Sequence, residues 1–169
     1  MVDRVLSKID AISEWSGRTF MWMSLPLIAA ITYDVTARYL FSAPTPWSYD
    51  VSYMLGGTLM VLGGAYTLLH HGHVRVDVLY NQLSTRGKLI LDISLTIIFF
   101  FPLLSVLFYH ATEAAIRSFA TQEVSSIGVW EPIMWPFRFV FPVGIGLTLL
   151  QGVSWFARNV QALAREVRP

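Results

Sequence analysis

The sequence contains no cysteine, which excludes disulfides, thiolate metal sites and cysteine nucleophiles. Charged residues are also scarce: they make up 14% of the 169 residues, whereas soluble domains contain about 25%. So few charges leave too little polar surface to solvate a globular domain of this size. The net charge of +1 gives no electrostatic basis for nucleic-acid binding. The composition therefore indicates a membrane protein.

Long stretches without Asp, Glu, Lys or Arg occur four times along the chain. A helix of about 20 residues crosses the roughly 30 Å of hydrocarbon in a bilayer. A soluble helical bundle would need polar helix faces, which the second and fourth stretches lack. We therefore expect an all-α integral membrane protein with a single membrane domain over residues 1–169. Its spans are expected at about 19–38, 51–70, 91–112 and 138–158.

The positive charges predict the orientation of these spans. Of the 12 Lys and Arg residues, nine lie before the first span, in the central loop or after the last span. The other three lie in the first and third loops. Because cytoplasmic loops carry the excess of positive charge, both termini and the central loop are expected in the cytoplasm.

Residues 1–18 have the pattern of an amphipathic helix. Five apolar residues share one helical face, and charged residues occupy the rest: the apolar ones are Val2, Val5, Leu6, Ile9 and Ile12. This pattern predicts a helix lying on the cytoplasmic membrane interface. The alternative is a soluble extension of the first span. A cleaved signal peptide is not expected, since no basic patch leads into a short apolar core.

Histidines raise the possibility of a haem-binding membrane anchor of a redox complex, which would use histidines from neighbouring helices. On the predicted topology His70 and His71 lie at the cytoplasmic face, and His110 lies near the opposite face. Ligands about a membrane thickness apart cannot hold one iron, so we expect no cofactor. The HHGH run at 70–73 could bind a metal adventitiously, but solvated histidines are the ordinary interpretation. Motifs for nucleophiles, phosphate loops and paired catalytic carboxylates are absent from the sequence, which predicts no enzyme.

Asp34 lies inside the end of the first span, where an ionisable residue is a functional candidate by default. Arg38 follows four residues later on the same helical face, so the two can form an intrahelical pair. We favour this structural pair over an ion site.

Small residues form stripes along two of the spans. Such stripes allow close approach of helices in lipid. They could serve packing within this chain or docking on a larger membrane partner, and the sequence leaves both open. The residues are Ser52, Gly56, Gly63 and Thr67 in the second span and Gly144, Thr148 and Gly152 in the fourth.

Four segments of the chain resemble one family. GGAYTLLHHGHVRVDVLY (63–80) is similar to the signature of the small membrane subunit, the Q or DctQ-like subunit, of tripartite ATP-independent periplasmic (TRAP) transporters. RYLFSAPTPWSYD (38–50), EVSSIGVWEPIMWPFRFVFP (123–142) and LLQGVSWFARNV (149–160) resemble it in the same order. Asp50 stands where many members have Glu. The resemblance covers nearly the whole chain.

This resemblance implies a small subunit of a sodium-driven uptake system in the bacterial inner membrane. In the family a periplasmic binding protein (P subunit) captures an organic acid, and a large elevator-type membrane subunit (M subunit) moves it. The small subunit braces the large one, among membrane lipids, and helps dock the binding protein. The resemblance of 123–135 favours a 2-oxo acid or other carboxylate over sialic acid.

The resemblance also assigns expected roles to residues. The two small-residue stripes are expected to dock on the large subunit. From its own residue pattern, and not from the resemblance, the HVRVD element is expected to form a structural clamp of His73, Arg75 and Asp77 at the cytoplasmic interface, within this chain or to the large subunit, in which a bidentate guanidinium contact would not tolerate lysine. The alternative is that Arg75 only helps to hold the loop in the cytoplasm. The expected contacts to the binding protein are Trp47, Asp50, Glu123, Ser126 and Trp130.

Overall fold

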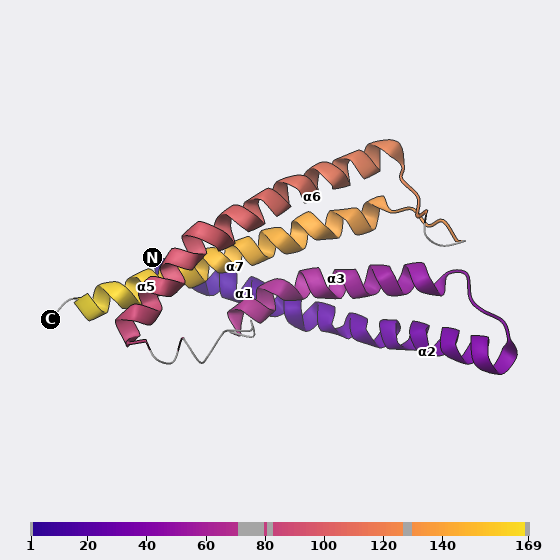
Figure 1. Ribbon diagram of the computed structural model, residues 1–169, viewed down its shortest axis with the longest axis horizontal. Coiled ribbons are helices and arrows are strands. Elements are labelled where there is room, and N and C mark those ends of the chain that lie inside the picture. Colours follow the sequence, from indigo (N-terminus) through magenta and orange to yellow (C-terminus); the bar gives the residue numbers. More distant parts are fainter. Residues whose placement is uncertain (1, 71–79, 81–82, 127–129, 168–169) are drawn as a thin grey trace.

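The computed structural model of the chain is shown in Figure 1 and describes all residues except 1, 71–79, 81–82, 127–129 and 168–169. The described residues are almost entirely helical, and the one β-bridge among them pairs Val124 with Ile133. The all-α class is therefore confirmed. The helical elements are α1 (Val2–Phe20), the 3-10 turn η1 (Met21–Met23), α2 (Ser24–Phe41), α3 (Ser48–Leu69), α5 (Thr85–Leu95), the π-helical turn η2 (Thr96–Phe100), α6 (Phe101–Thr121) and α7 (Trp135–Val167).

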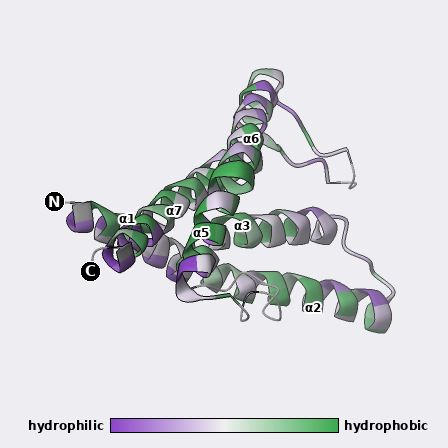
Figure 2. Ribbon diagram, turned by 60° about the vertical axis from the view of Figure 1, so that its left-hand side comes forward, coloured by the Kyte–Doolittle hydropathy of each residue, from purple (hydrophilic) through white to green (hydrophobic). Residues whose placement is uncertain are grey.

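These elements join into four long helical rods. The rods Asp3–Phe41, Ser48–Leu69, Thr85–Thr121 and Trp135–Glu166 are each long and apolar enough to cross a membrane. Figure 2 shows hydrophobic residues along the middle of α2 and α6, with hydrophilic ones on α1 and towards the helix ends. The chain is therefore a multi-pass membrane protein, and its helices run beyond the expected spans because helix formation does not stop at the edge of the hydrocarbon.

The termini and two of the loops lie at opposite ends of the bundle. In Figure 1 both termini lie at one end, and the loops after α2 and α6 lie at the other. We call these the inner end and the outer end, after the orientation that the charge count predicts. At the outer end α2 stops at Ser42 and α6 at Gln122, each in the left-handed conformation with φ of 51° and 48°. Prolines at 44 and 46 prevent α2 from continuing.

Helix α7 is the centre of the bundle. It contacts α1, α3, α5 and α6, whereas α2 packs chiefly on α3. In the most apolar stretch of each rod, 28% of the residues are buried in the rod of α7 but only 6% in the rod of α5 and α6. The rod of α5 and α6 thus presents most of its surface to its surroundings.

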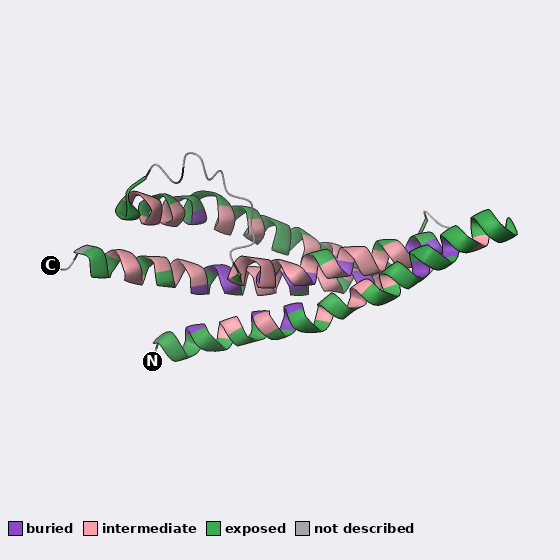
Figure 3. Cartoon of the chain, turned by 90° about the horizontal axis from the view of Figure 1, so that it is seen from below, coloured by how far each residue is buried: buried purple, intermediate pink, exposed green. Residues whose placement is uncertain are grey.

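The distribution of buried and exposed side chains differs from that of a soluble protein. The completely buried side chains are small, the serines Ser13, Ser16, Ser118 and Ser154 and the alanines Ala65 and Ala115, while most large apolar side chains lie outside. In Figure 3 exposed residues cover most of the ribbon, and the buried positions of α1 follow one side of the helix. Exposed apolar side chains over small, polar contacts are what lipid solvation favours.

Helix α1 packs with a different face from the one that its amphipathic pattern emphasised. Its buried residues include Leu6, Ser13 and Gly17, whereas Val5 and Ile12 are 54% and 47% exposed. A Cβ on Gly17 would lie 2.2 Å from Cγ of Tyr66, so α1 and α3 approach closely there. Helix α1 continues into α2 through η1 and so forms an extension of the first span. Its apolar face is only partly covered, since Leu6 is buried while Val5 and Ile12 are exposed, and the interfacial placement of that face remains a prediction.

The third rod contains a wide turn. Residues Thr96–Phe100 form the π-helical turn η2, and Thr96 donates its hydroxyl proton to the carbonyl oxygen of Asp92 at 2.6 Å. After this turn the Phe100 ring lies against α7, where a Cβ on Gly152 would be 2.2 Å from the ring atom Cε1. Turns of this kind are rare, and this one lies where the rod passes over the central helix.

Candidate partner-binding surfaces

The glycines of α3 fall into two groups that face in different directions. Gly57 and Gly64 face α7: a Cβ on Gly57 would lie 2.9 Å from the Phe137 ring, and one on Gly64 would lie 3.0 Å from Oγ1 of Thr148. A Cβ on Gly56 or Gly63 would have no atom within 4 Å among the described residues, apart from its own stretch of helix. The first pair is therefore used inside the bundle, and the second pair is open.

The small residues of α7 serve packing within the chain. A Cβ on Gly144 would lie 2.4 Å from Cγ1 and 2.7 Å from the carbonyl oxygen of Val61, and Gly152 is covered by Phe100. Thr148 donates its hydroxyl proton to the carbonyl oxygen of Gly144 at 2.9 Å. Since α3 and η2 lie against Gly144 and Gly152, packing within the chain accounts for these small residues, and the docking of Gly144, Thr148 and Gly152 on a partner stays a prediction.

The open glycines belong to one continuous face of α3. Tyr49, Tyr53, Gly56, Met60 and Gly63 recur at intervals of three and four residues, so they share one side of the helix. Tyr49, Tyr53 and Met60 are 58%, 48% and 78% exposed. We call this surface the open face of α3. It is a stripe of exposed side chains interrupted by two positions at which the backbone itself is accessible.

The two polar residues predicted for the same stripe flank this face. Thr67 donates its hydroxyl proton to the carbonyl oxygen of Gly63 at 3.0 Å, so its side chain needs no partner elsewhere. Ser52 lies one turn before Gly56 and is half-buried. Thr67 therefore adds no free polar group to the open face.

At the outer end a carboxylate clamps the loop that joins α2 to α3. Asp34, which is 8% exposed, accepts a hydrogen bond from the Arg38 guanidinium at 2.6 Å. It also accepts from the Thr45 backbone N–H at 3.2 Å and from the Thr45 hydroxyl. The spacing predicted the Arg38 contact but not the Thr45 contacts. With its charge paired and both oxygens hydrogen-bonded, the carboxylate is arranged as a structural link.

A second carboxylate holds the loop between α6 and α7. Asp50 accepts a hydrogen bond from the Ser125 hydroxyl at 2.6 Å and is only 2% exposed. The backbone N–H of Met134 donates to the carbonyl oxygen of Glu123 at 2.8 Å, which closes the loop on itself. Asp50 was expected to contact the binding protein directly. In the structure its side chain turns into the protein and positions the loop, and a contact with the binding protein stays a prediction.

The remaining outer residues differ in how accessible they are. Glu123 forms an ion pair with Arg138 at 2.8 Å, and this hydrogen bond is the main reason that the pKa of the Glu123 carboxyl lies below its usual value. Trp47 is half-buried and stacks on Tyr33, with ring centroids 5.8 Å apart. Ser126 is exposed and Trp130 is 51% exposed. Of the five expected contacts, these last two are the most accessible.

At the inner end a polar cluster that was not predicted from the sequence joins α1 to α7. Asp10 accepts hydrogen bonds from the Gln151 amide at 3.0 Å, from the Ser154 hydroxyl at 2.9 Å and from the Arg158 guanidinium. Ser13 donates to the Gln151 side-chain oxygen at 2.7 Å. The available signal was the presence of Gln151 and Ser154 within an otherwise apolar span. Polar groups at such a depth need partners.

Comparison with known proteins is decisive for the family. Residues 27–162 match the family described as "Tripartite ATP-independent periplasmic transporters, DctQ component". The chain belongs to the DctQ family. The sialic acid TRAP transporter small permease protein SiaQ of Vibrio cholerae serotype O1 is 25% identical to it over 120 residues, which are 69% of this chain and 68% of that protein. The resemblance seen in the sequence is thus confirmed: the protein is a small membrane subunit of a TRAP transporter, a family of transport components.

In this DctQ-family subunit the two histidines that the structure describes each lie beside a carboxylate. His70 Nε2 lies 2.7 Å from the Glu14 carboxylate, and His110 Nδ1 lies 3.6 Å from that of Glu113. Within the part of the chain that the structure describes, no three His, Asp or Glu residues are grouped as metal ligands. His71 and the predicted clamp of His73, Arg75 and Asp77 lie outside the described residues.

Proposed function

We propose that this DctQ-family subunit braces the large membrane subunit of its transporter through the open face of α3. The transporter is proposed to lie in the bacterial inner membrane, with both termini of this chain in the cytoplasm. There the complex takes up an organic acid with sodium, delivered by a periplasmic binding protein. The observation that carries the proposal is the open space at Gly56 and Gly63, where no other described part of the chain lies within 4 Å of a Cβ position.

A glycine inside a helix lowers helix stability by about 1 kcal/mol relative to alanine. The other α3 glycines, Gly57 and Gly64, compensate by letting α7 approach, whereas Gly56 and Gly63 have no such role within the chain. In lipid, helices associate by close packing, and small residues permit backbones to approach. A helix of the large subunit seated on the open face would use both glycines.

The outer loop is proposed to help dock the binding protein. Trp130 is exposed on a loop that Asp50 and the Glu123–Arg138 pair hold in place. An exposed tryptophan suits a protein contact, because tryptophan is enriched among the residues that dominate binding. Ser126 lies on the same loop. For Trp47, which stacks on Tyr33, we propose a supporting role beside it.

For the substrate we propose a carboxylate, in line with the resemblance of 123–135 to members for 2-oxo acids. The similar protein from Vibrio cholerae is named for sialic acid, itself an organic acid, so the broader class suits both. The substrate site itself is proposed to lie in the large subunit, because the one buried carboxylate of the first span, Asp34, is already paired. The clamp of His73, Arg75 and Asp77 stays a proposal on the sequence pattern.

The test is co-purification of the large subunit with tagged variants of this chain. Gly56→Leu and Gly63→Leu should lower recovery of the large subunit, because a bulky side chain would separate the helices. Ser105→Leu is the matched control, since Ser105 is an exposed small residue on α6. Recovery that is unchanged in both glycine variants would show that the open face contacts lipid and not the large subunit.

A further inference from the structure

A pocket at the inner end lies between the start of α1 and the last turns of α7. Its volume is about 300 Å³, and its lining combines charged, amide and apolar groups: Asp3, Leu6, Arg158, Gln161, Ala162 and Arg165. None of these residues belongs to the open face of α3 or to the outer loops. The pocket is therefore separate from the surfaces assigned above.

The length of α7 places this pocket at the depth of lipid headgroups. The helix has 33 residues, which is about 50 Å of length, and the hydrocarbon takes up roughly 30 Å of it. Its start at Trp135 belongs to the outer end, so the excess emerges at the inner end. Trp155 lies three residues before Arg158 and is of the residue type that concentrates at the membrane interface.

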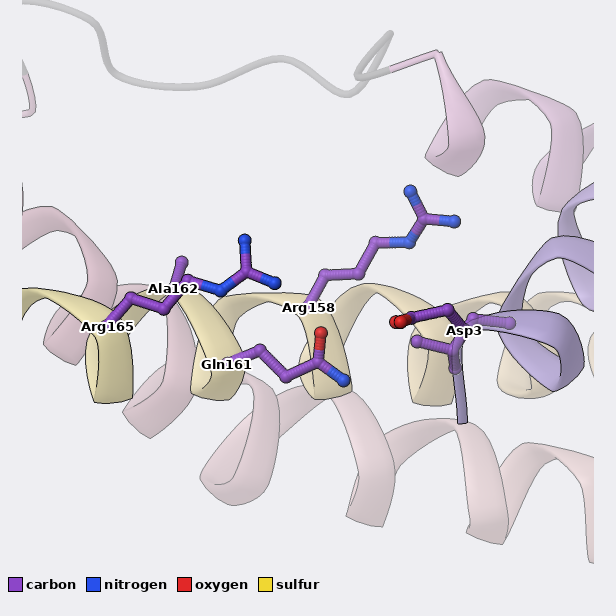
Figure 4. A pocket seen from close by; sticks show the side chains of 6 residues that line it. Asp3, Arg158, Gln161, Ala162 and Arg165 are labelled. Atoms are coloured by element: carbon purple, nitrogen blue, oxygen red, sulfur yellow. The ribbon is translucent and has the colours of Figure 1, made fainter. Parts of the chain in front are cut away.

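The charged groups of the pocket are of both signs. In Figure 4 the guanidinium groups of Arg158 and Arg165 rise on the same side of α7, and the Asp3 carboxylate points towards Gln161. Arg158 is held in place by Asp10. Asp3 and Arg165 line the same pocket, yet neither forms an ion pair within the described part of the chain. The pocket thus offers an unpaired carboxylate and an unpaired guanidinium.

We propose that this pocket binds the headgroup of a zwitterionic aminophospholipid from the leaflet next to the two termini. The two guanidinium groups hold the phosphate, whose oxygens match their planar donor geometry. The Asp3 carboxylate faces the ammonium group of the same headgroup. A purely anionic headgroup would satisfy the arginines but would be repelled by Asp3, so the mixed charge of the lining favours the zwitterion.

Apolar groups next to the pocket suit the rest of the lipid. Leu6, which is 5% exposed, forms part of the pocket wall. Val5 and Ile12 are exposed on the same helix. Their apolar surface provides a path for the acyl chains beside the headgroup, and this gives the exposed part of the apolar face of α1 an occupant.

The experiment measures lipid binding to the purified full chain in detergent by native mass spectrometry. The probes are phosphatidylethanolamine and phosphatidylglycerol with identical acyl chains. Wild type should prefer phosphatidylethanolamine. Arg165→Gln should weaken its binding about five-fold, since one basic residue near a lipid surface contributes about 1 kcal/mol. Because Arg165 forms no ion pair, this substitution leaves the polar cluster around Asp10 intact.

Two further variants make the result specific. Arg86→Gln, an exposed arginine at the start of α5, removes the same charge outside the pocket and should leave binding unchanged. Asp3→Asn should abolish the preference for phosphatidylethanolamine. Equal effects of Arg165→Gln and Arg86→Gln, or a preference that survives Asp3→Asn, would overturn the proposal. So would inorganic phosphate, if at millimolar concentration it displaces the lipid completely, because the site would then be one for a soluble anion.

Discussion

Gly144 is the most informative position to perturb, because a side chain there would meet the backbone of a neighbouring helix. Helix α7 passes α3 so closely that a Cβ on Gly144 would lie 2.4 Å from Cγ1 and 2.7 Å from the carbonyl oxygen of Val61. The Val61 side chain can rotate away, but its carbonyl oxygen is part of the α3 backbone and cannot. Gly144→Ala therefore forces the two helices apart. Gly63→Ala is the matched control, because it adds the same methyl group where no other described part of the chain lies within 4 Å.

The magnitude follows from two opposing effects. Extra methyl groups in a packed interior cost about 1–3 kcal/mol, and a backbone obstacle places Gly144→Ala near the upper end of that range. Both substitutions gain about 1 kcal/mol of helix propensity. We therefore expect Gly144→Ala to lower the free energy of unfolding by about 2 kcal/mol and Gly63→Ala to raise it by about 1 kcal/mol. The difference between the two variants is about 3 kcal/mol, and the propensity contribution cancels from it.

The assay is reversible unfolding of the isolated chain in mixed micelles, followed by circular dichroism as a denaturing detergent is added. The chain alone is the appropriate sample, since Gly63 is expected to matter only when the large subunit is present. Equal unfolding free energies for Gly144→Ala and Gly63→Ala would refute the reasoning. That result would mean that α3 and α7 are not in close contact at Gly144.

Three further predictions concern the two ends of the bundle. Cysteine introduced at Thr45 should react with an impermeant thiol reagent in intact cells and cysteine at Ser84 should not; the reverse labelling would invert the topology. Asp10→Ala should lower the free energy of unfolding by about 2 kcal/mol, because it removes a charged acceptor from three donors; an unchanged unfolding curve would contradict the cluster. Since the Arg138 hydrogen bond lowers the pKa of Glu123 below its usual 4.5, its stabilisation is present above that pH and is lost as the pH falls through the lowered value. The difference in Tm between wild type and Glu123→Gln should therefore shrink on acidification, and a difference that grows would contradict this sign.

The features that sequence predicts well here are those contained within one helix. Long uncharged stretches require helices in lipid, since every backbone polar group must be satisfied within the segment. The Asp34–Arg38 pair follows from a spacing of four residues on one helical face. The hydrogen bonds from Thr45 to the same carboxylate depend on how the following loop folds back. No local pattern specifies that path.

Contacts between helices could not be predicted from the sequence, for a geometric reason. Adjacent glycines such as Gly56 and Gly57 differ by about 100° around the helix axis, and a small rotation of α3 decides which of them faces α7. Periodicity identifies a stripe of small residues but gives no absolute orientation. For the same reason the sequence did not show that Asp50 turns inward to Ser125, 75 positions further along the chain.

The wide turn at Thr96–Phe100 sets which face α6 presents to the bundle relative to the face that α5 presents. An α-helix advances by about 100° per residue, and a π-helical turn accommodates one extra residue without breaking the rod. The face that α5 presents to α7 and the face that α6 presents further along are therefore offset by that one residue. If the same residues formed an ordinary α-helix with none deleted, all of α6 would rotate by about 100° about its axis. Ala115 and Ser118 are both buried in the present arrangement. They would then rotate out of the bundle, so the five residues of the turn determine which side of α6 packs inside.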